Sequence, residues 1–109
     1  MSKKWTFQNI PDLAGKIIIV TGANSGIGFE AAKEFARKGA QTILACRNLE
    51  KGQAALRKIQ VEIPQSSAEN MQLDLASLAS VRHFATAFMA KYNRLDVLVN
   101  NAGIMMVPY

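Results

Sequence analysis

Apolar residues occur in two alternating patterns along this chain of 109 residues. Short continuous runs rich in β-branched residues, such as "IIIV" at 17–20, are typical of buried strands. They alternate with longer stretches in which apolar residues recur every three or four positions, as on one face of a helix. Strands that alternate with helices of this length predict right-handed crossovers and a parallel sheet, so the predicted fold class is α/β.

The pattern predicts four strands and three helices after an N-terminal leader at residues 1–14. Gly39 and Pro64 are residues that commonly end helices, and they mark the ends of the first and second helix. We interpret "QSSAEN" at 65–70 as a polar loop. The strands are predicted at 16–22, 40–46, 71–75 and 96–100, and the helices at 27–38, at 49–63 and from about Ser77.

Each predicted helix has an apolar stripe that should face the core. The first stripe is Ile27, Ala31, Ala32, Phe35 and Ala36; the second is Leu49, Ala55, Leu56, Ile59 and Ile63; the third is Leu78, Val81, Phe84, Ala85, Phe88 and Tyr92.

Composition narrows the class of protein. Half of the residues are hydrophobic and 19% are charged, which is typical of soluble globular domains. No apolar run approaches the roughly 20 residues that span a bilayer, and no signal peptide is evident. The net charge of +5 suits either a basic surface or an anionic ligand, but no basic run interleaved with aromatic residues indicates nucleic acid. The single cysteine, Cys46, excludes an intrachain disulfide; we expect it to be a core residue of a cytoplasmic protein.

Three glycines lie between the first strand and the first helix, in "TGANSGIG". A glycine-rich turn that follows a strand and opens a helix is the context of a dinucleotide-binding fingerprint. Gly22 would permit a sharp turn, Gly26 would let the backbone approach a pyrophosphate, and Gly28 would let the helix pack closely. The helix N-terminus would offer free N–H groups to the phosphates. The alternative is that the glycines serve only the turn and the packing.

The spacing of these glycines, with Thr21 before them, resembles the N-terminal signature of the short-chain dehydrogenase/reductase family. Two further family features follow in order, "LDL" at 73–75 and "NNAG" at 100–103, each at the end of a predicted strand. The resemblance covers the chain after the leader. It implies a Rossmann-type doubly wound parallel sheet, with the first strand between the second and the fourth, truncated after the fourth strand. Residues 15–109 would then form a partial NADP-binding domain.

The resemblance also implies which residues meet the cofactor. Asp74 and Leu75 would contact adenine, and Asn101 to Gly103 would line the adenosine ribose. For Asn100 two alternatives stay open, a cofactor contact and a polar turn that ties neighbouring strands. The predicted cofactor-binding residues are Gly22, Asn24, Ser25, Gly26, Ile27, Gly28, Arg47, Asn48, Asp74, Leu75, Asn101, Ala102 and Gly103.

The end of the second strand predicts which dinucleotide is preferred. An NAD site has an acidic residue about 20 positions after the glycines, where it holds the ribose 2′-hydroxyl. Here the strand ends in "ACRN", and Arg47 stands 19 residues after Gly28. A guanidinium can hold a 2′-phosphate in a bidentate fork, whereas a carboxylate would repel it. We therefore predict NADP(H), with Asn48 as a helper; for Lys51 we favour an ordinary solvated lysine over a second helper.

The catalytic residues that the family implies are not in this sequence. Hydride transfer in the family uses a tyrosine with a lysine four residues later, and a serine beyond "NNAG". Tyr92 is followed four positions later by Asp96, and Tyr109 is the last residue, so we assign no catalytic residue. His83 has no cluster of ligands around it, so we assign no metal site.

The function predicted is that of an NADP(H)-dependent oxidoreductase acting on an alcohol or carbonyl, present as its cofactor-binding half and inactive alone. The alternatives are a non-catalytic NADP-binding module and an inactive truncated fragment. "IPDLAGK", "ACRNLEKG" and "NNAGIM" resemble reductases related to retinol dehydrogenases and protochlorophyllide reductases, which implies a small, lipophilic substrate and a homo-oligomer. The fourth strand would be an exposed edge, so we expect marginal stability or self-association.

Overall fold

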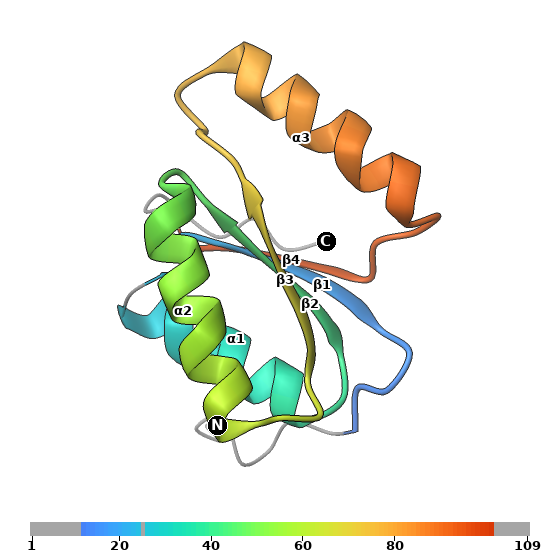
Figure 1. The fold of residues 1–109 in the computed structure, drawn as a ribbon. Helices are drawn as coiled ribbons and strands as arrows, with labels where there is room; N and C mark the ends of the chain where they lie inside the picture. Colours follow the sequence, from blue (N-terminus) through green and yellow to red (C-terminus); the bar gives the residue numbers. More distant parts are fainter. Residues whose placement is uncertain (1–11, 25, 102–109) are drawn as a thin grey trace, which may run out of the picture.

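The structure is a computed structural model that describes residues 12–24 and 26–101. Figure 1 shows one sheet with α1 and α2 on one face and α3 on the other. The alternation of strands and helices confirms the α/β class, and both faces of the sheet are covered. The elements are β1 (Ile17–Thr21), α1 (Gly26–Arg37), β2 (Gln41–Cys46), α2 (Leu49–Glu62), β3 (Ser67–Gln72), α3 (Leu78–Lys91) and β4 (Val97–Asn100).

The strands lie in the order β3-β2-β1-β4, and all three pairings are parallel. β1 therefore lies between β2 and β4, as the family resemblance implied. Its central residue Ile19 pairs with Ile43 of β2 on one side and with Leu98 of β4 on the other. β4 pairs with β1 alone within the described sheet, and its Val97 and Leu98 are each 42% exposed.

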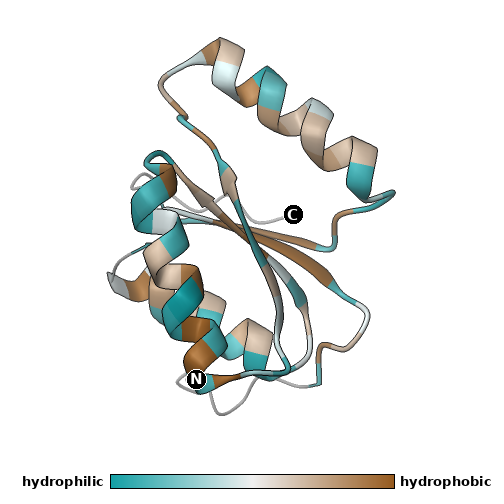
Figure 2. Cartoon of the chain, viewed as in Figure 1, coloured by the Kyte–Doolittle hydropathy of each residue, from teal (hydrophilic) through white to brown (hydrophobic). Residues whose placement is uncertain are grey.

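Two hydrophobic clusters fill the spaces on either side of the sheet. Ile18 and Val20 point toward α1 and α2, where they join Ile59 in the larger cluster. Ile19 points the other way and packs with Phe84 of α3. Successive strand residues alternate between the two faces. This explains why the strand sequence is apolar without interruption, and Figure 2 shows β1 and β4 in the brown of hydrophobic residues.

A third strand is present as predicted, but its predicted bounds were wrong. The segment predicted as a polar loop, 65–70, supplies most of β3, which runs from Ser67 to Gln72 rather than from 71 to 75. The cause is pairing with a neighbour: residues 67–72 align with Gln41–Cys46 of β2, and this ladder satisfies their backbone groups. Tertiary pairing of this kind overrides the local preference of a polar sequence.

The polar side chains of β3 have partners on both faces of the sheet. Glu69 accepts a hydrogen bond from the hydroxyl of Tyr92 and pairs with Lys91 at 2.7 Å, both at the end of α3. Asn70 lies on the opposite face and donates to the carbonyl of Leu49 in α2. β3 is thus polar because it bonds to helices on either side.

Three residues predicted to face the core are exposed instead. Ile27, Leu49 and Leu78 are 76%, 46% and 65% exposed, respectively. Each lies in the first turn of its helix, where the described residues cover it only in part. Cys46, in contrast, is buried in the larger cluster as predicted. No described helix is long and apolar enough to cross a membrane.

Candidate functional site

The predicted site residues follow the carboxyl ends of four parallel strands. β1 leads into the glycine loop at 22–28, β2 into Arg47, β3 into Asp74, and β4 into Asn101. Because the strands are parallel, these ends lie along one edge of the sheet. This is the edge at which ligands bind in open α/β folds. Ser25, Ala102 and Gly103, also predicted as site residues, lie outside the described residues.

The glycine loop has two positions that require glycine for their backbone conformation. Gly22 has φ +61° and Gly26 has φ +59°, in the left-handed region that other residues rarely adopt. Apart from its chain neighbours and the backbone of α1, no described residue has an atom within 4 Å of the place where a Cβ of Gly26 would be, so the backbone there borders open space at the N-terminus of α1. Among the described residues, therefore, no side chain blocks the predicted approach of a pyrophosphate to Gly26.

Gly28 is constrained by packing. A Cβ at this position would lie 2.6 Å from the carbonyl oxygen of Gly22 and would collide with the side-chain amide of Asn101. The prediction that Gly28 lets the helix pack closely holds, and the neighbours are the glycine loop itself and the end of β4. Gly28 thus brings α1, the loop and β4 together.

The hydroxyl of Thr21 joins β1 to the end of β4. It donates to Oδ1 of Asn100 at 2.9 Å and accepts the backbone N–H of Asn101 at 2.8 Å. The side chain of Asn101 then donates to the carbonyl of Gly22 at 3.2 Å. Asn100 therefore links the neighbouring strands β1 and β4. Asn101 stabilises the glycine loop through its hydrogen bond to Gly22.

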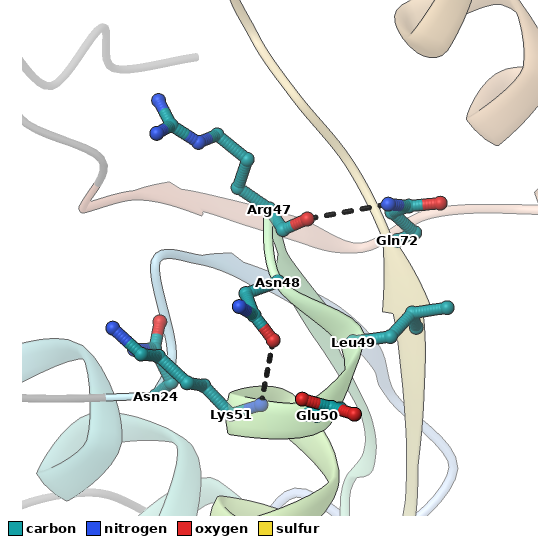
Figure 3. Close-up of a pocket in the computed structure, with 7 residues that line it drawn as sticks. All are labelled: Asn24, Arg47, Asn48, Leu49, Glu50, Lys51 and Gln72. Atoms are coloured by element: carbon teal, nitrogen blue, oxygen red, sulfur yellow. Dashed lines mark hydrogen bonds between the residues drawn. The ribbon is translucent and has the colours of Figure 1, made fainter.

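Arg47 lines a pocket of about 570 Å³ together with Asn24, Asn48, Leu49, Glu50, Lys51 and Gln72. Figure 3 shows the side chain of Lys51 reaching toward Asn24, the guanidinium of Arg47 extending away from the other labelled side chains, and the carboxylate of Glu50 turned away from that guanidinium. Within residues 12–24 and 26–101 the guanidinium of Arg47 has no hydrogen-bond or ion-pair partner. Asn48 caps α2 by accepting the N–H of Lys51 at 3.0 Å. The pocket thus contains the guanidinium of Arg47, unpaired among the described residues, next to the capped N-terminus of α2.

A second pocket, of about 420 Å³, adjoins the first. The two share Asn24 and Arg47, and the second is also lined by Gly22, Ala45, Leu73, Asp74, Leu75 and Ala76. The turn that carries Asp74 is held by its own hydrogen bonds: Oδ1 of Asp74 accepts the N–H of Ala76, and its N–H donates to Ser80 Oγ at 2.9 Å. The residues predicted to contact adenine therefore lie next to those predicted to hold the 2′-phosphate.

Cys46 lies beneath the glycine loop. Burial raises the pKa of its thiol, while hydrogen bonds with the backbone of Ala23 and Asn24 act in the opposite direction. Because the net pKa shift is upward, the thiol stays protonated at neutral pH, and protonated thiols are poor nucleophiles. Cys46 supports the loop from the core, and its environment is not that of a reactive cysteine.

The remaining candidates stand apart from this edge. Tyr92 lies at the C-terminal end of α3, where burial and the hydrogen bond to Glu69 raise its pKa. His83 is exposed on α3, and the described residues contain no group of three His, Cys, Asp or Glu side chains that could hold a metal. Ile27 is exposed in the first turn of α1.

The comparisons with known proteins agree with this geometry. The model of the short chain dehydrogenase family matches residues 16–108. The chain belongs to this family. It is 57% identical to the WW domain-containing oxidoreductase of Gallus gallus over 93 residues, which are 85% of this chain and 22% of that protein. It is 48% identical to retinol dehydrogenase 11 of Homo sapiens over 97 residues, or 89% of this chain and 30% of that one.

A solved structure supports the same assignment. The crystal structure of a metagenomic short-chain oxidoreductase in complex with NADP has a TM-score of 0.77 and 39% identity, covering 85% of this chain and 41% of that one. The family resemblance and the Rossmann-type sheet are thus confirmed. The chain spans less than a third of the two curated relatives, and the described sheet contains four strands.

The prediction of site residues omitted Thr21 and Gln72, which the structure brings to this edge, and it favoured an ordinary solvated role for Lys51, which lies there too. Thr21 links β1 to β4, and Gln72 and Lys51 line the pocket of Arg47. A signal for Gln72 was present in the sequence: with Asn70 it forms a polar pair two residues apart, which places both side chains on one face of a strand. That signal was missed because Asn70 was assigned to the loop at 65–70 and only Gln72 to the predicted strand at 71–75.

Proposed function

We propose that this chain forms the cofactor-binding part of an NADP(H)-dependent oxidoreductase, which transfers hydride between the nicotinamide and an alcohol or carbonyl carbon. The observation that carries the proposal is the guanidinium of Arg47, exposed and without a partner among the described residues. It borders both pockets at the carboxyl edge of the sheet. An unpaired guanidinium at the end of the second strand suits a 2′-phosphate in bidentate geometry.

The neighbouring residues fit the rest of the nucleotide. Gly26 leaves open space at the N-terminus of α1, where N–H groups and the helix dipole favour a pyrophosphate. The pocket of Asp74 and Leu75, which adjoins Arg47, has room for an adenine. Glu50 is a carboxylate in the lining of the Arg47 pocket, but Figure 3 shows it directed away from the guanidinium.

Two relatives favour the finer assignments. The metagenomic short-chain oxidoreductase was solved with NADP, which supports the same cofactor here. The likeness to retinol dehydrogenase 11 supports a small, lipophilic alcohol or carbonyl substrate. We also propose that the whole protein is a homo-oligomer located in the cytoplasm, and that these 109 residues alone do not turn over substrate, because the family's catalytic tyrosine and lysine are not among them.

The proposal is tested with the full-length natural protein, NADPH and a lipophilic aldehyde such as retinal. We expect loss of the NADPH absorbance that depends on the aldehyde and is much slower with NADH. Absence of turnover with a panel of aldehydes, ketones and alcohols, despite tight binding of NADPH, would favour the non-catalytic binding module. Equal rates with NADH and NADPH would contradict the assigned cofactor.

A further inference from the structure

Two side-chain amides of β3 hold the segment that joins β2 to α2. Nδ2 of Asn70 donates to the carbonyl of Leu49 at 3.0 Å, and Nε2 of Gln72 donates to the carbonyl of Arg47 at 3.3 Å. Figure 3 shows the second of these bonds. Because Asn70 and Gln72 are two residues apart on a strand, their side chains lie on the same face. The backbone of residues 47–49 is therefore anchored at both ends by a neighbouring strand.

The orientation of Asn70 is fixed by its surroundings. Its Oδ1 is buried and has no hydrogen-bond partner within the described chain, and it lies against Gly52 of α2, where any Cβ would collide with it. Rotating the amide by half a turn would place Oδ1 against the carbonyl oxygen of Leu49, which is repulsive. The hydrogen bond to Leu49 thus determines which way the amide points. The missing Cβ of Gly52 lets α2 approach β3 closely enough for this contact.

The hydrogen bonds of Asn70 and Gln72 hold the backbone next to Arg47, whose guanidinium is the cation of the proposed site. Arg47 and Asn48 lie between the end of β2 and the first residue of α2, and the carbonyl of Asn48 already accepts the N–H of Gly52 at 3.0 Å in the first turn of that helix. A guanidinium meets a phosphate in bidentate geometry only if its backbone is held in place. Gln72 holds the carbonyl of Arg47 itself, and Asn70 holds the first turn of the helix that Asn48 caps.

We propose that Asn70 and Gln72 are positioning residues that set the preference for a 2′-phosphate by fixing the backbone on which Arg47 stands. This inference rests on the proposed NADP(H) function. The inference assigns a role in cofactor selection to β3. It would explain why the strand has polar residues, Asn70 and Gln72, on the face toward α2. Asn70 does not line the pocket of Arg47, so an effect of Asn70 on selectivity requires transmission through the backbone.

The test compares Asn70→Ala and Gln72→Ala in the full-length protein by titration with NADPH and with NADH. Loss of one hydrogen bond that positions a charged group should weaken NADPH binding roughly three- to tenfold. Binding of NADH, which lacks the 2′-phosphate, should change by less than about twofold. Gln60→Ala removes an exposed amide from α2 and is the matched control. Gln72 is also exposed, so its variant keeps the test valid if Asn70→Ala impairs folding.

A second set of variants separates positioning from direct contact. In an Arg47→Ala background, Asn70→Ala and Gln72→Ala should have no further effect on NADPH affinity, because they act through Arg47. Further losses in that background, or equal losses of NADPH and NADH affinity, would overturn the positioning role. If Arg47→Ala weakens NADPH binding but neither amide variant does, the inference fails and the proposed function stands. If Arg47→Ala leaves NADPH affinity unchanged, the proposed NADP(H) function is contradicted, and the positioning role that rests on it is contradicted with it.

Discussion

The hydroxyl oxygen of Thr21 accepts the backbone N–H of Asn101 at 2.8 Å, although the two residues are 80 positions apart in the chain. Thr21 ends the strand that leads into the glycine loop, and Asn101 follows the last described strand. The same asparagine reaches back to the carbonyl of Gly22. Two of the motifs that indicate the family are therefore parts of one hydrogen-bonded unit.

Thr21→Val tests this unit. The substitution keeps the shape of the buried side chain but leaves the N–H of Asn101 without its acceptor, which should lower the free energy of unfolding by about 1–3 kcal/mol. Urea unfolding measures the change. Thr42→Val is the matched control, because the buried hydroxyl of Thr42 donates to Ala40 within its own segment, at 3.3 Å. Equal losses of unfolding free energy in the two variants would show that the hydrogen bond between Thr21 and Asn101 stabilises the fold no more than a local one.

Gly28→Ala should be destabilising although alanine is the better helix former. Propensity alone favours alanine by about 1 kcal/mol, but the added Cβ would lie 2.6 Å from the backbone oxygen of Gly22. Overpacking against a backbone atom costs about 1–3 kcal/mol, so we expect a lower melting temperature and weaker NADPH binding together. A more stable Gly28→Ala would contradict the packing described.

At Gly26 the space beside the backbone is open. The variant Gly26→Asn, in which asparagine tolerates a positive φ, should therefore reduce NADPH affinity with little loss of stability.

Cys46 should react slowly with thiol reagents in the folded protein. Burial raises the pKa of its thiol, so little of the reactive thiolate is present at neutral pH, and the side chain is inaccessible. We expect labelling to be at least about tenfold slower than in the unfolded chain. Mass spectrometry of the peptide that contains Cys46 measures the labelling rate. The backbone of Ala23 and Asn24 in the glycine loop acts on the pKa of this thiol, so saturating NADPH should slow labelling further. Unchanged labelling with NADPH bound would place the cofactor elsewhere.

Asp96 predicts how stability depends on pH. Its Oδ2 accepts the N–H of Ile17 at 2.8 Å and the Nε of Arg94 at 3.1 Å, and the bond from Ile17 is the main cause of a lowered pKa. A folded-state pKa below the unfolded value means that the stabilisation is complete above the unfolded pKa and is lost as the pH falls through the folded pKa.

The measurement for Asp96 is urea unfolding across the acidic range. The wild type should be more stable than Asp96→Asn near neutral pH, and the difference should shrink as the pH falls and Asp96 becomes protonated. A difference that stays constant, or grows toward low pH, would contradict the lowered pKa.

Much of this architecture could be predicted from the sequence because it depends on local signals. "IIIV" at 17–20 is apolar because both sheet faces are covered, and the glycines at 22 and 26 have positive φ. β3 could not be predicted in this way. Most of its residues 67–72 are polar, and their conformation depends on pairing with β2 and on helices elsewhere in the chain. The link between Gln72 and Arg47 was hidden for the same reason, since it exists only once β3 lies beside β2.

The exposed first turns show a related limit. Helical periodicity places Ile27, Leu49 and Leu78 on the inner stripe, yet each is exposed. Periodicity specifies the side of a helix on which a residue lies, but not how far the helix extends past the sheet that it covers. That distance follows from the lengths of the strands and loops in three dimensions.

The most direct test of the account is titration of the full-length protein and its Arg47→Asp variant with NADPH and NADH. Arg57→Asp makes the same change of charge at an exposed position of α2 that lines neither of the two site pockets, and it is the control. We predict that NADPH binds more tightly than NADH to the wild type and to Arg57→Asp. In Arg47→Asp the loss of a charged hydrogen bond and the added repulsion should weaken NADPH binding by about 100-fold, with NADH retained or improved. Unchanged NADPH affinity in Arg47→Asp would contradict the assignment of Arg47 as the residue that selects the 2′-phosphate.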